Sequence, residues 1–232
     1  MLAVVLAGGL GTRLRNVVKD LPKPMANIGG KPFLEYLLFY LSKQNIRRTV
    51  LSVGYKYEAI LNYFGNSFQD MKLEYVIEKE PLGTGGAIKK VAETVQEDEF
   101  LVLNGDTLFN VELKKLVEFS EEHKSDVVVA VKYVDKPERY GTVVIDNNNR
   151  IVLFREKGAS LEGGYINGGI YVVRKTSFLS KCQSEKFSFE RDFLEAYYKD
   201  LHFHACAFDE YFIDIGVPED YERAQRELPL IV

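Results

Sequence analysis

Short apolar runs alternate with segments of helical character along the first 135 residues, and this alternation constrains the fold more than any other feature. The expected strands are Leu2–Leu6, Thr49–Val53, Leu73–Ile77, Phe100–Leu103 and Val127–Val134. The helices expected between them are Phe33–Lys43, Tyr57–Phe64, Gly86–Val95 and Leu113–Lys124. Strand–helix–strand repeats place parallel strands side by side, with helices covering both faces. The sequence therefore predicts an α/β fold of three layers, with helices on both sides of a mainly parallel sheet.

The pattern changes after about residue 135. Strands are expected at Thr142–Ile145, Ile151–Phe154 and Tyr165–Val173, followed by helices at Phe187–Tyr198 and Pro218–Leu228. Turn-rich pieces separate these strands, which favours a small β-rich insert appended to the α/β core. No linker or repeat interrupts the sequence. We expect one domain over residues 1–232, with a core at about 1–135 and a second part at about 136–232.

Charge and cysteine content exclude several classes of function. The formal net charge is −4, so the overall field does not favour nucleic acid or an anionic membrane. The two cysteines, Cys182 and Cys206, have no metal-binding spacing. The chain starts without a basic segment and has no run of about 20 apolar residues. These features predict a cytoplasmic protein that does not enter a membrane.

Three glycines follow the first expected strand, in the run Leu6-Ala7-Gly8-Gly9-Leu10-Gly11-Thr12-Arg13-Leu14. Such a loop brings consecutive backbone N–H groups close to a ligand and can form a nest for an anion. The alternative is an ordinary glycine turn. A dinucleotide-binding GxGxxG motif needs a further glycine where Leu14 stands, and a phosphate-binding GKS/T motif fails at Pro32.

Two cations strengthen the case for an anionic ligand. Arg13 ends the glycine loop, and Lys23 lies between two prolines in Leu21-Pro22-Lys23-Pro24-Met25. Prolines restrict the backbone on either side, so Lys23 is presented from a stiff segment. Arginine binds phosphate oxygens as a fork, whereas lysine acts as a point charge. The alternative for Lys23 is a solvated surface cation.

These motifs carry a resemblance to a known family. The run LAGGLGTRL followed by LPKPM resembles the signature of the sugar-1-phosphate nucleotidylyltransferases. Further matching runs are PLGTGG at 81–86, LNGD at 103–106, Glu156-Lys157, NGGIY at 167–171 and DIGVPED at 214–220. The resemblance covers essentially the whole chain and implies a Rossmann-like fold. It also implies transfer of a nucleotidyl group from a nucleoside triphosphate to a sugar 1-phosphate, with release of pyrophosphate.

One departure narrows the resemblance. The residues after GTRL are Arg15-Asn16-Val17-Val18-Lys19-Asp20, where the common pattern has proline and then threonine. Together with GGKPFLEYLL and EPLGTGGAI, this variant looks most like the guanylyltransferases that act on D-glycero-α-D-manno-heptose 1-phosphate. Such an enzyme uses GTP and makes a GDP-heptose for a bacterial surface polysaccharide. Mannose 1-phosphate is the alternative sugar substrate.

Two aspartates are the metal candidates. Asp106 follows the expected strand Phe100–Leu103, and ligands of open α/β sheets bind at the carboxyl ends of strands. Asp214 lies within an apolar stretch, where a carboxylate is costly unless it is paired or coordinated. A turn aspartate and a capping or salt-bridged aspartate are the respective alternatives. The resemblance implies that both bind Mg²⁺, which suits phosphate chemistry because it needs only one or two carboxylates from protein.

The resemblance also implies roles for the remaining candidates. Arg13, Lys23 and Asp106 are the expected catalytic residues. The nucleotide would be bound by Leu6, Ala7, Gly8, Gly9, Gly11, Thr12, Arg13, Lys23, Glu78, Glu80, Pro81, Gly83, Thr84, Asn104 and Asp106. Either Glu78 or Glu80 is a candidate to accept hydrogen bonds from guanine. The sugar phosphate would be bound by Tyr140, Gly141, Glu156, Lys157, Asn167, Gly168 and Asp214.

Two other functions are considered. A non-catalytic, regulatory nucleotide-sugar-binding protein on the same fold would tend to lose the lysine or a metal-binding acid, and both are retained. A dehydrogenase is disfavoured by the failed GxGxxG motif. The expected small-molecule partners are therefore GTP and a sugar 1-phosphate. A homodimer is the usual expectation for a soluble protein.

Overall fold

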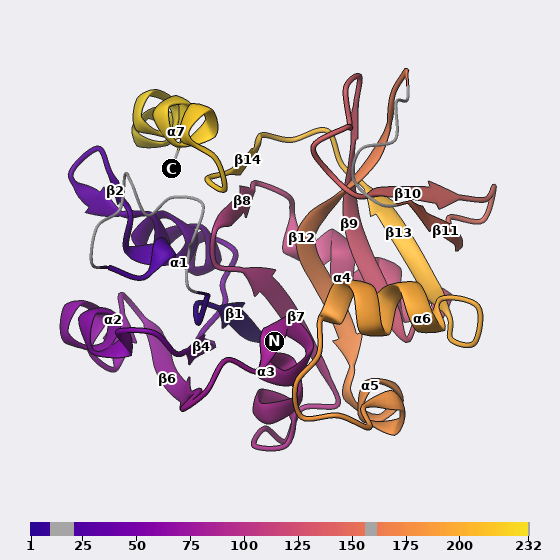
Figure 1. The fold of residues 1–232 in the computed structure, drawn as a ribbon, viewed down its shortest axis with the longest axis horizontal. Coiled ribbons are helices and arrows are strands. Elements are labelled where there is room, and N and C mark those ends of the chain that lie inside the picture. The colour runs from indigo at the N-terminus through magenta and orange to yellow at the C-terminus, as the bar shows by residue number, and fades with distance from the viewer. Residues whose placement is uncertain (10–20, 156–161, 232) are drawn as a thin grey trace.

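The computed structural model describes residues 1–9, 21–155 and 162–231. In this part of the chain ten strands form one mixed sheet, whose main path runs β11-β10-β12-β7-β1-β4-β6-β5, with β9 joining β12 to β13. The strands β7, β1, β4 and β6 at its centre are all parallel to their neighbours in that group. On the other side, β12 runs antiparallel to β7, β9 and β10. The predicted α/β fold with a mixed, centrally parallel sheet is confirmed (Figure 1).

The elements have the following bounds. The strands of the main sheet are β1 (Leu2–Leu6), β4 (Arg48–Val53), β5 (Ser67–Phe68), β6 (Met71–Ile77), β7 (Glu99–Asn104), β9 (Val127–Val134), β10 (Thr142–Ile145), β11 (Ile151–Arg155), β12 (Gly164–Arg174) and β13 (Phe203–Ala207). Two small sheets pair β2 (Asn27–Ile28) with β3 (Lys31–Pro32), and β8 (Thr107–Phe109) with β14 (Phe212–Asp214). The helices are α1 (Phe33–Lys43), α2 (Tyr57–Phe64), α3 (Gly83–Ala92), α4 (Leu113–His123), α5 (Lys175–Lys181), α6 (Glu195–Tyr197) and α7 (Pro218–Ile231). A 3₁₀ turn covers Lys23–Met25, and a π-helical segment covers Phe189–Leu194.

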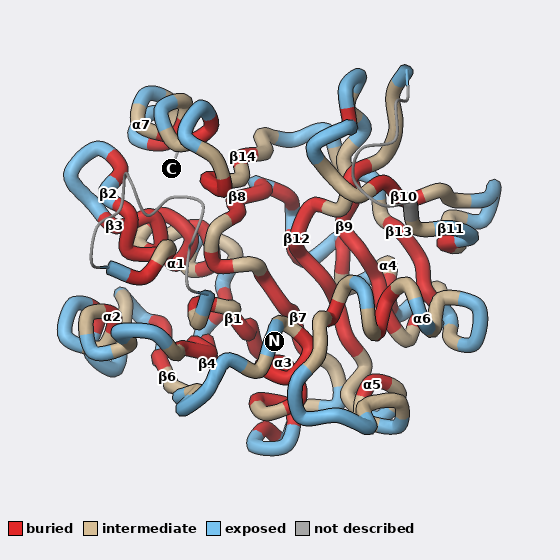
Figure 2. The backbone as a smooth tube through the Cα atoms, in the orientation of Figure 1, coloured by how far each residue is buried: buried red, intermediate tan, exposed pale blue. Residues whose placement is uncertain are grey.

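Two hydrophobic cores lie on opposite faces of the sheet. Alternate residues of β1 divide between them: Ala3 and Val5 pack with α1, α2 and α4, whereas Leu2 and Val4 pack with α3, α5 and the π-helical segment. This follows from the two-residue period of a strand, which sends successive side chains to opposite faces. Figure 2 shows the central strands buried and the outer turns of the helices exposed, as a three-layer arrangement requires.

Most predicted elements are found, with shifted ends. The helix expected to begin at Gly86 begins at Gly83. Its first turn contains Gly83, Gly85 and Gly86, where residues 185–187 approach too closely to leave room for a Cβ. The helix expected over Phe187–Tyr198 is instead the π-helical segment continued by α6. The backbone of Phe187 pairs instead with the start of α3, because its N–H donates to the Leu82 carbonyl and its carbonyl accepts from the Gly85 N–H, both at 3.0 Å. The strands expected after residue 135 are present, but they extend the main sheet.

A third, smaller core lies apart from the sheet. Ala26 and Ile28 from the segment after Lys23, Leu108 from β8, and Ile213 and Ile215 around Asp214 contribute to it. Helix α7 covers these residues with Ala224 and Leu228, and Phe33 and Tyr36 from the start of α1 complete it. Figure 1 shows α7 beside β2 and above α1, far along the chain from both. This core joins three segments that are distant in sequence.

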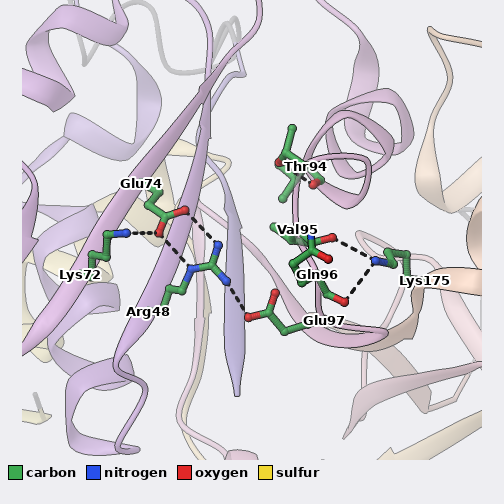
Figure 3. Close-up of polar contacts among 9 residues, drawn as sticks. Arg48, Lys72, Glu74, Thr94, Val95, Gln96, Glu97 and Lys175 are labelled. Atoms are coloured by element: carbon green, nitrogen blue, oxygen red, sulfur yellow. Dashed lines mark hydrogen bonds and ion pairs between the residues drawn. The ribbon is translucent and has the colours of Figure 1, made fainter.

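An ion-pair network holds the opposite end of the sheet. Arg48, the first residue of β4, binds Glu74 through two nitrogens at 3.0 Å each and Glu97 at 2.6 Å (Figure 3). Lys72 also contacts Glu74, at 2.7 Å. The hydrogen bond from Arg48 lowers the pKa of Glu74 to about 2. Because this network lies at the amino end of β4, it stabilises the sheet away from the strand ends that carry the candidate site.

The buried imidazole of His204 makes the stability of the fold depend on pH. Its Nδ1 lies 2.9 Å from the hydroxyl of Ser125, and only 8% of the residue is exposed. Burial, followed by the nearby His123, lowers the pKa of His204 below its usual 6.5. The unfolded chain therefore binds a proton near pH 6.5 that the folded chain resists, and this contribution to stability is lost as the pH falls below 6.5.

We expect the free energy of unfolding to fall less between pH 7.5 and pH 5.5 in His204→Gln than in the parent protein. Each unit by which the folded state lowers the pKa of His204 adds up to ~1.4 kcal/mol to this difference. Urea unfolding at both pH values measures it. Equal pH dependence in the two proteins would contradict the role given to His204.

Candidate active site

The candidate site is built at the carboxyl ends of the central parallel strands. Leu6 at the end of β1 lies in register with Ser52 of β4 and Asn104 of β7. The chain then turns across this edge, because the backbone N–H groups of Ala7 and Gly105 donate to Ser52 and Leu6 at 2.7 and 3.0 Å. Gly105 allows this contact, since a Cβ there would lie 2.5 Å from the Leu6 carbonyl oxygen. The position of Asp106 thus follows from a glycine that lets β7 turn against β1.

A cavity of about 460 Å³ opens at this edge. The residues that line it are Leu6, Gly8, Gly9, Lys23, Pro24, Glu78, Pro81, Gly83, Thr84, Ala87, Asn104, Gly105 and Asp106. Most of the expected nucleotide-binding residues therefore share one cavity. Ala7 is buried behind it, and Glu80 is exposed and outside the lining. Gly11, Thr12 and Arg13 lie outside the described residues.

Glu78 is held at the wall of this cavity. Its two carboxylate oxygens accept hydrogen bonds from the Ser52 hydroxyl at 3.1 Å and from the Leu82 backbone N–H at 3.2 Å. Gly8 makes room for the carboxylate, because a Cβ on Gly8 would lie 2.6 Å from Glu78 Oε1. Each carboxylate oxygen has a second lone pair, so Glu78 keeps acceptor capacity for a ligand.

A second cavity of about 480 Å³ adjoins the first at Asn104, which lines both. The residues that line it are Asn104, Thr107, Tyr140, Gly141, Thr142, Phe154, Asn167, Gly169, Tyr171, Glu190, Arg191, Leu194, Glu195, Phe212 and Asp214. Tyr140, Gly141, Asn167 and Asp214 are thus brought together as expected. Gly168 packs against the ring of Phe109 instead, and its neighbour Gly169 reaches the cavity. Glu156 and Lys157 lie outside the described residues.

Two buried acceptors at the second cavity have no hydrogen-bond partner within residues 1–9, 21–155 and 162–231. They are Asn104 Oδ1 and Thr142 Oγ1. A buried polar atom without a partner is costly, so such atoms mark places where a ligand or water completes the hydrogen bonding. Asn104 lies where the two cavities meet.

Lys23 lies between Asp106 and Asp214 at the boundary of the two cavities. Its ammonium nitrogen is 2.5 Å from Asp106 Oδ2 and 3.8 Å from Asp214 Oδ1. The lysine side chain is 13% exposed, and the two carboxylates are 34% and 33% exposed. Lys23 begins the 3₁₀ turn after Pro22, whose carbonyl accepts from Met25 at 2.8 Å. The stiffness expected from the flanking prolines thus takes the form of a closed turn.

The two aspartates meet because β8 pairs with β14. Asp214 lies opposite Thr107 in this pairing, and the Ile215 N–H donates to the Asp106 carbonyl at 3.0 Å. Both carboxylates are further oriented: Thr107 Oγ1 donates to Asp106 Oδ1 at 3.2 Å, and the Gly216 N–H donates to Asp214 Oδ1 at 2.8 Å. Two carboxylates that approach one cation form a donor set suited to a hard divalent ion, which takes its remaining ligands from phosphates and water. Groups of three or more His, Cys, Asp or Glu that could hold a metal are absent from the described residues.

Sequence reasoning missed the wall formed by the π-helical segment. Glu190, Arg191 and Glu195 line the second cavity. Glu190 Oε2 accepts from Thr84 Oγ1 at 2.7 Å, and Thr84 lines the first cavity. This hydrogen bond connects the walls of the two cavities. The apolar spacing of residues 187–198 resembled an ordinary helix, and nothing in it indicated which polar residues would face a ligand.

The fold and this site define a nucleotidyl transferase. Residues 2–229 match the model of the nucleotidyl transferase family, and the chain belongs to that family. Members of this family typically use a divalent metal ion. None of the described helices has the length and apolar character needed to cross a bilayer.

Several relatives match this chain over nearly their whole length. It is 51% identical over 228 residues to a D-glycero-alpha-D-manno-heptose 1-phosphate guanylyltransferase of Aneurinibacillus thermoaerophilus, covering 98% of both chains. It is 50% identical over 221 residues to a protein of the same name from Campylobacter jejuni, covering 95% of this chain and 97% of the relative. Its fold matches the crystal structure of HddC from Yersinia pseudotuberculosis with a TM-score of 0.88 and 42% identity, covering 97% of each chain. The same protein complexed with GMP-PN matches with a TM-score of 0.85.

Proposed function

We propose that this protein transfers a guanylyl group from GTP to D-glycero-α-D-manno-heptose 1-phosphate and releases pyrophosphate. The observation that carries the proposal is the position of Lys23 between Asp106 and Asp214, at the boundary of two adjoining cavities. The similarity to two heptose 1-phosphate guanylyltransferases over nearly their full length supports this choice of substrates. The product serves a bacterial surface polysaccharide. Mannose 1-phosphate is the second candidate sugar.

The reaction joins two anions, and the site answers their repulsion. A phosphate oxygen of the sugar 1-phosphate attacks the α-phosphorus of GTP, and the bond to the β-phosphate oxygen breaks with pyrophosphate as the leaving group. The attacking oxygen is already ionised, so no protein nucleophile is needed. Catalysis then rests on positioning the two phosphates and on stabilising negative charge with groups that are already oriented.

Lys23 supplies the fixed positive charge. Its ammonium group lies beside Asp106, at the edge of the first cavity, where it would stabilise charge at the α-phosphate. Asp106 and Asp214 would hold Mg²⁺, which would supply positive charge that lowers the repulsion between the two phosphates. Arg13 and the Gly8–Thr12 backbone bind the remaining phosphates of the triphosphate.

The first cavity binds the nucleotide and the second binds the sugar phosphate. Glu78 accepts hydrogen bonds from the N1–H and N2–H₂ donors of guanine at the wall of the first cavity. Tyr140, Gly141, Asn167 and Asp214 line the second cavity and bind the sugar phosphate there, and Glu156 and Lys157 keep their expected role as further sugar-phosphate ligands. Asn104 lines both cavities and offers its free acceptor where the two molecules meet.

An enzyme is favoured over a regulatory nucleotide-sugar-binding protein. Lys23, Asp106 and Asp214 are all retained and converge on one point. A protein that only bound the nucleotide sugar would gain nothing from a lysine held between two acids, because phosphate binding alone does not require them. The protein is expected to act in the cytoplasm, and a homodimer stays the expected assembly.

We expect Lys23→Ala and Asp106→Asn to lower kcat by at least about 100-fold, because the first removes a positive charge that stabilises the transition state and the second removes a carboxylate that would hold the metal ion. Pyrophosphate release from GTP and heptose 1-phosphate measures the rate, and circular dichroism checks the fold. Lys114→Ala is the matched control, since Lys114 is 77% exposed on α4 and pairs only with Glu118 among the described ion pairs. Rates near the parent value in folded Lys23 and Asp106 variants would contradict the assignment.

We expect Glu78→Gln to reduce the preference for GTP over ATP by about 10-fold or more, because an amide N–H₂ would then face a guanine donor. Glu80→Gln is the control, since Glu80 is exposed and outside the cavity lining. A matrix of four nucleoside triphosphates against heptose and mannose 1-phosphates, read as pyrophosphate, gives the selectivities. The assignment of base recognition fails if Glu78→Gln keeps the parent selectivity.

A further inference from the structure

A buried carboxylate behind the second cavity is held by two arginines. Asp220 lies in the first turn of α7, and only 8% of its side chain is exposed. Its Oδ2 accepts a hydrogen bond from Arg139, and its Oδ1 lies 3.7 Å from Arg223. Asp220 does not itself line either cavity. A buried charge is retained only when it is paired, so these three residues form one ionic unit.

The first arginine of this unit holds one wall of the second cavity. Arg139 lies in the turn that connects β9 to β10, where the Tyr140 N–H donates to the Pro137 carbonyl at 2.8 Å. The Arg139 guanidinium carbon is 5.8 Å from the centre of the Tyr140 ring, a distance typical of a cation–π contact. Tyr140 and Gly141 line the cavity. Asp220 therefore ties the turn that carries these residues to α7.

The second arginine holds the neighbouring part of the cavity wall. Arg223 donates to the backbone carbonyl of Phe212 at 3.0 Å. Phe212 lines the same cavity, and its ring contacts the Tyr140 ring edge-on at 5.8 Å. Phe212 also begins β14, the strand that ends in Asp214. Through Arg139 and Arg223, the Asp220 carboxylate thus holds the two segments that carry Tyr140 and Phe212, whose rings are in contact.

We propose that Asp220 is a positioning residue that sets the shape of the sugar-phosphate cavity by holding Arg139 and Arg223. The proposal rests on the proposed function for the identity of the ligand, but not for the geometry. Without the Asp220 charge, Arg139 loses the carboxylate that accepts its hydrogen bond and keeps only the smaller electrostatic interaction with Glu219, so the tie of the 137–140 turn to α7 is weakened. Tyr140 then spends less time against Phe212, and the cavity binds the sugar phosphate less well.

Steady-state kinetics provide the first test. The lost contacts position the wall that binds the sugar phosphate, and this binding is made equally in the ground state and the transition state. Asp220→Asn and Arg139→Gln should therefore each raise the KM for the sugar 1-phosphate about 10-fold and leave kcat and the KM for GTP within about twofold. The double variant should be no worse than the poorer single variant, since both remove the same interaction. Glu97→Gln removes a partner of Arg48 at the opposite end of the sheet, and it should lower stability without raising the sugar KM. A reduced melting temperature with an unchanged sugar KM in Asp220→Asn would show a purely structural role and overturn the proposal.

A second measurement needs no turnover. The chain contains no tryptophan, so Tyr140→Trp places a single tryptophan in the cavity wall, and its fluorescence reports on that wall. Acrylamide quenching of this residue should increase when Asp220→Asn or Arg139→Gln is added, but should not change when Glu97→Gln is added. Unchanged quenching in the Asp220→Asn background would overturn the proposal whatever reaction the protein catalyses. Absence of pyrophosphate release by the parent protein would overturn the proposed function alone.

Discussion

The ion pair between Lys23 and Asp106, with Asp214 close by, is the interaction on which the site depends. Two carboxylates directed at one point repel each other unless a cation lies between them, and the effect is strong where solvent is partly excluded. Lys23 supplies that cation at 2.5 Å from one carboxylate and 3.8 Å from the other. The same arrangement suits a reaction between two phosphates, because the Lys23 ammonium group that neutralises the two carboxylates can also neutralise a phosphate. A metal ion and a phosphate would together replace the contacts that Lys23 makes in the protein alone.

The fold provides this convergence through its third core. Lys23 is followed by Ala26 and Ile28, Asp106 by Leu108, and Asp214 is flanked by Ile213 and Ile215, all of which are buried in that core. Each charged residue is therefore attached to an apolar anchor within a few residues. Helix α7 closes the core and is tied to the β2–β3 hairpin by Gln225, which accepts from Gly29 at 2.9 Å and donates to the Asn27 carbonyl. The C-terminal helix thus belongs to the support of the site and also carries Asp220.

The sequence predicts those parts of the molecule that depend on local pattern. The apolar runs that became β1, β4, β6 and β7 specified the central sheet, and the expectation that Asp106 stands at its carboxyl edge followed from the end of one such run. The pairing of β8 with β14 was not predictable, because each strand has three residues and Asp214 follows Asp106 by 108 residues. The resemblance alone suggested that the two acids meet. The roles of the site residues all stay predictions, and Arg13, Glu156 and Lys157 also lie outside the described part of the chain.

The long-range contacts of Glu190 and Asp220 gave no local signal. Glu190 accepts from Thr84, 106 residues away, and Asp220 accepts from Arg139, 81 residues away. Gly168 was expected to face the sugar, but a Cβ there would meet Phe109, so packing explains that glycine and Gly169 lines the cavity. Such contacts depend on which surfaces the tertiary fold brings together, and spacing within one segment does not contain that information.

A crystal structure with a non-hydrolysable GTP analogue and Mn²⁺ tests the central claim most directly, because the anomalous signal of manganese locates the metal independently of the model. The account predicts a manganese peak bonded to the carboxylates of both Asp106 and Asp214, with the Lys23 ammonium group turned from Asp106 toward the α-phosphate. Manganese bound elsewhere, with the Lys23–Asp106 ion pair intact beside the nucleotide, would contradict it.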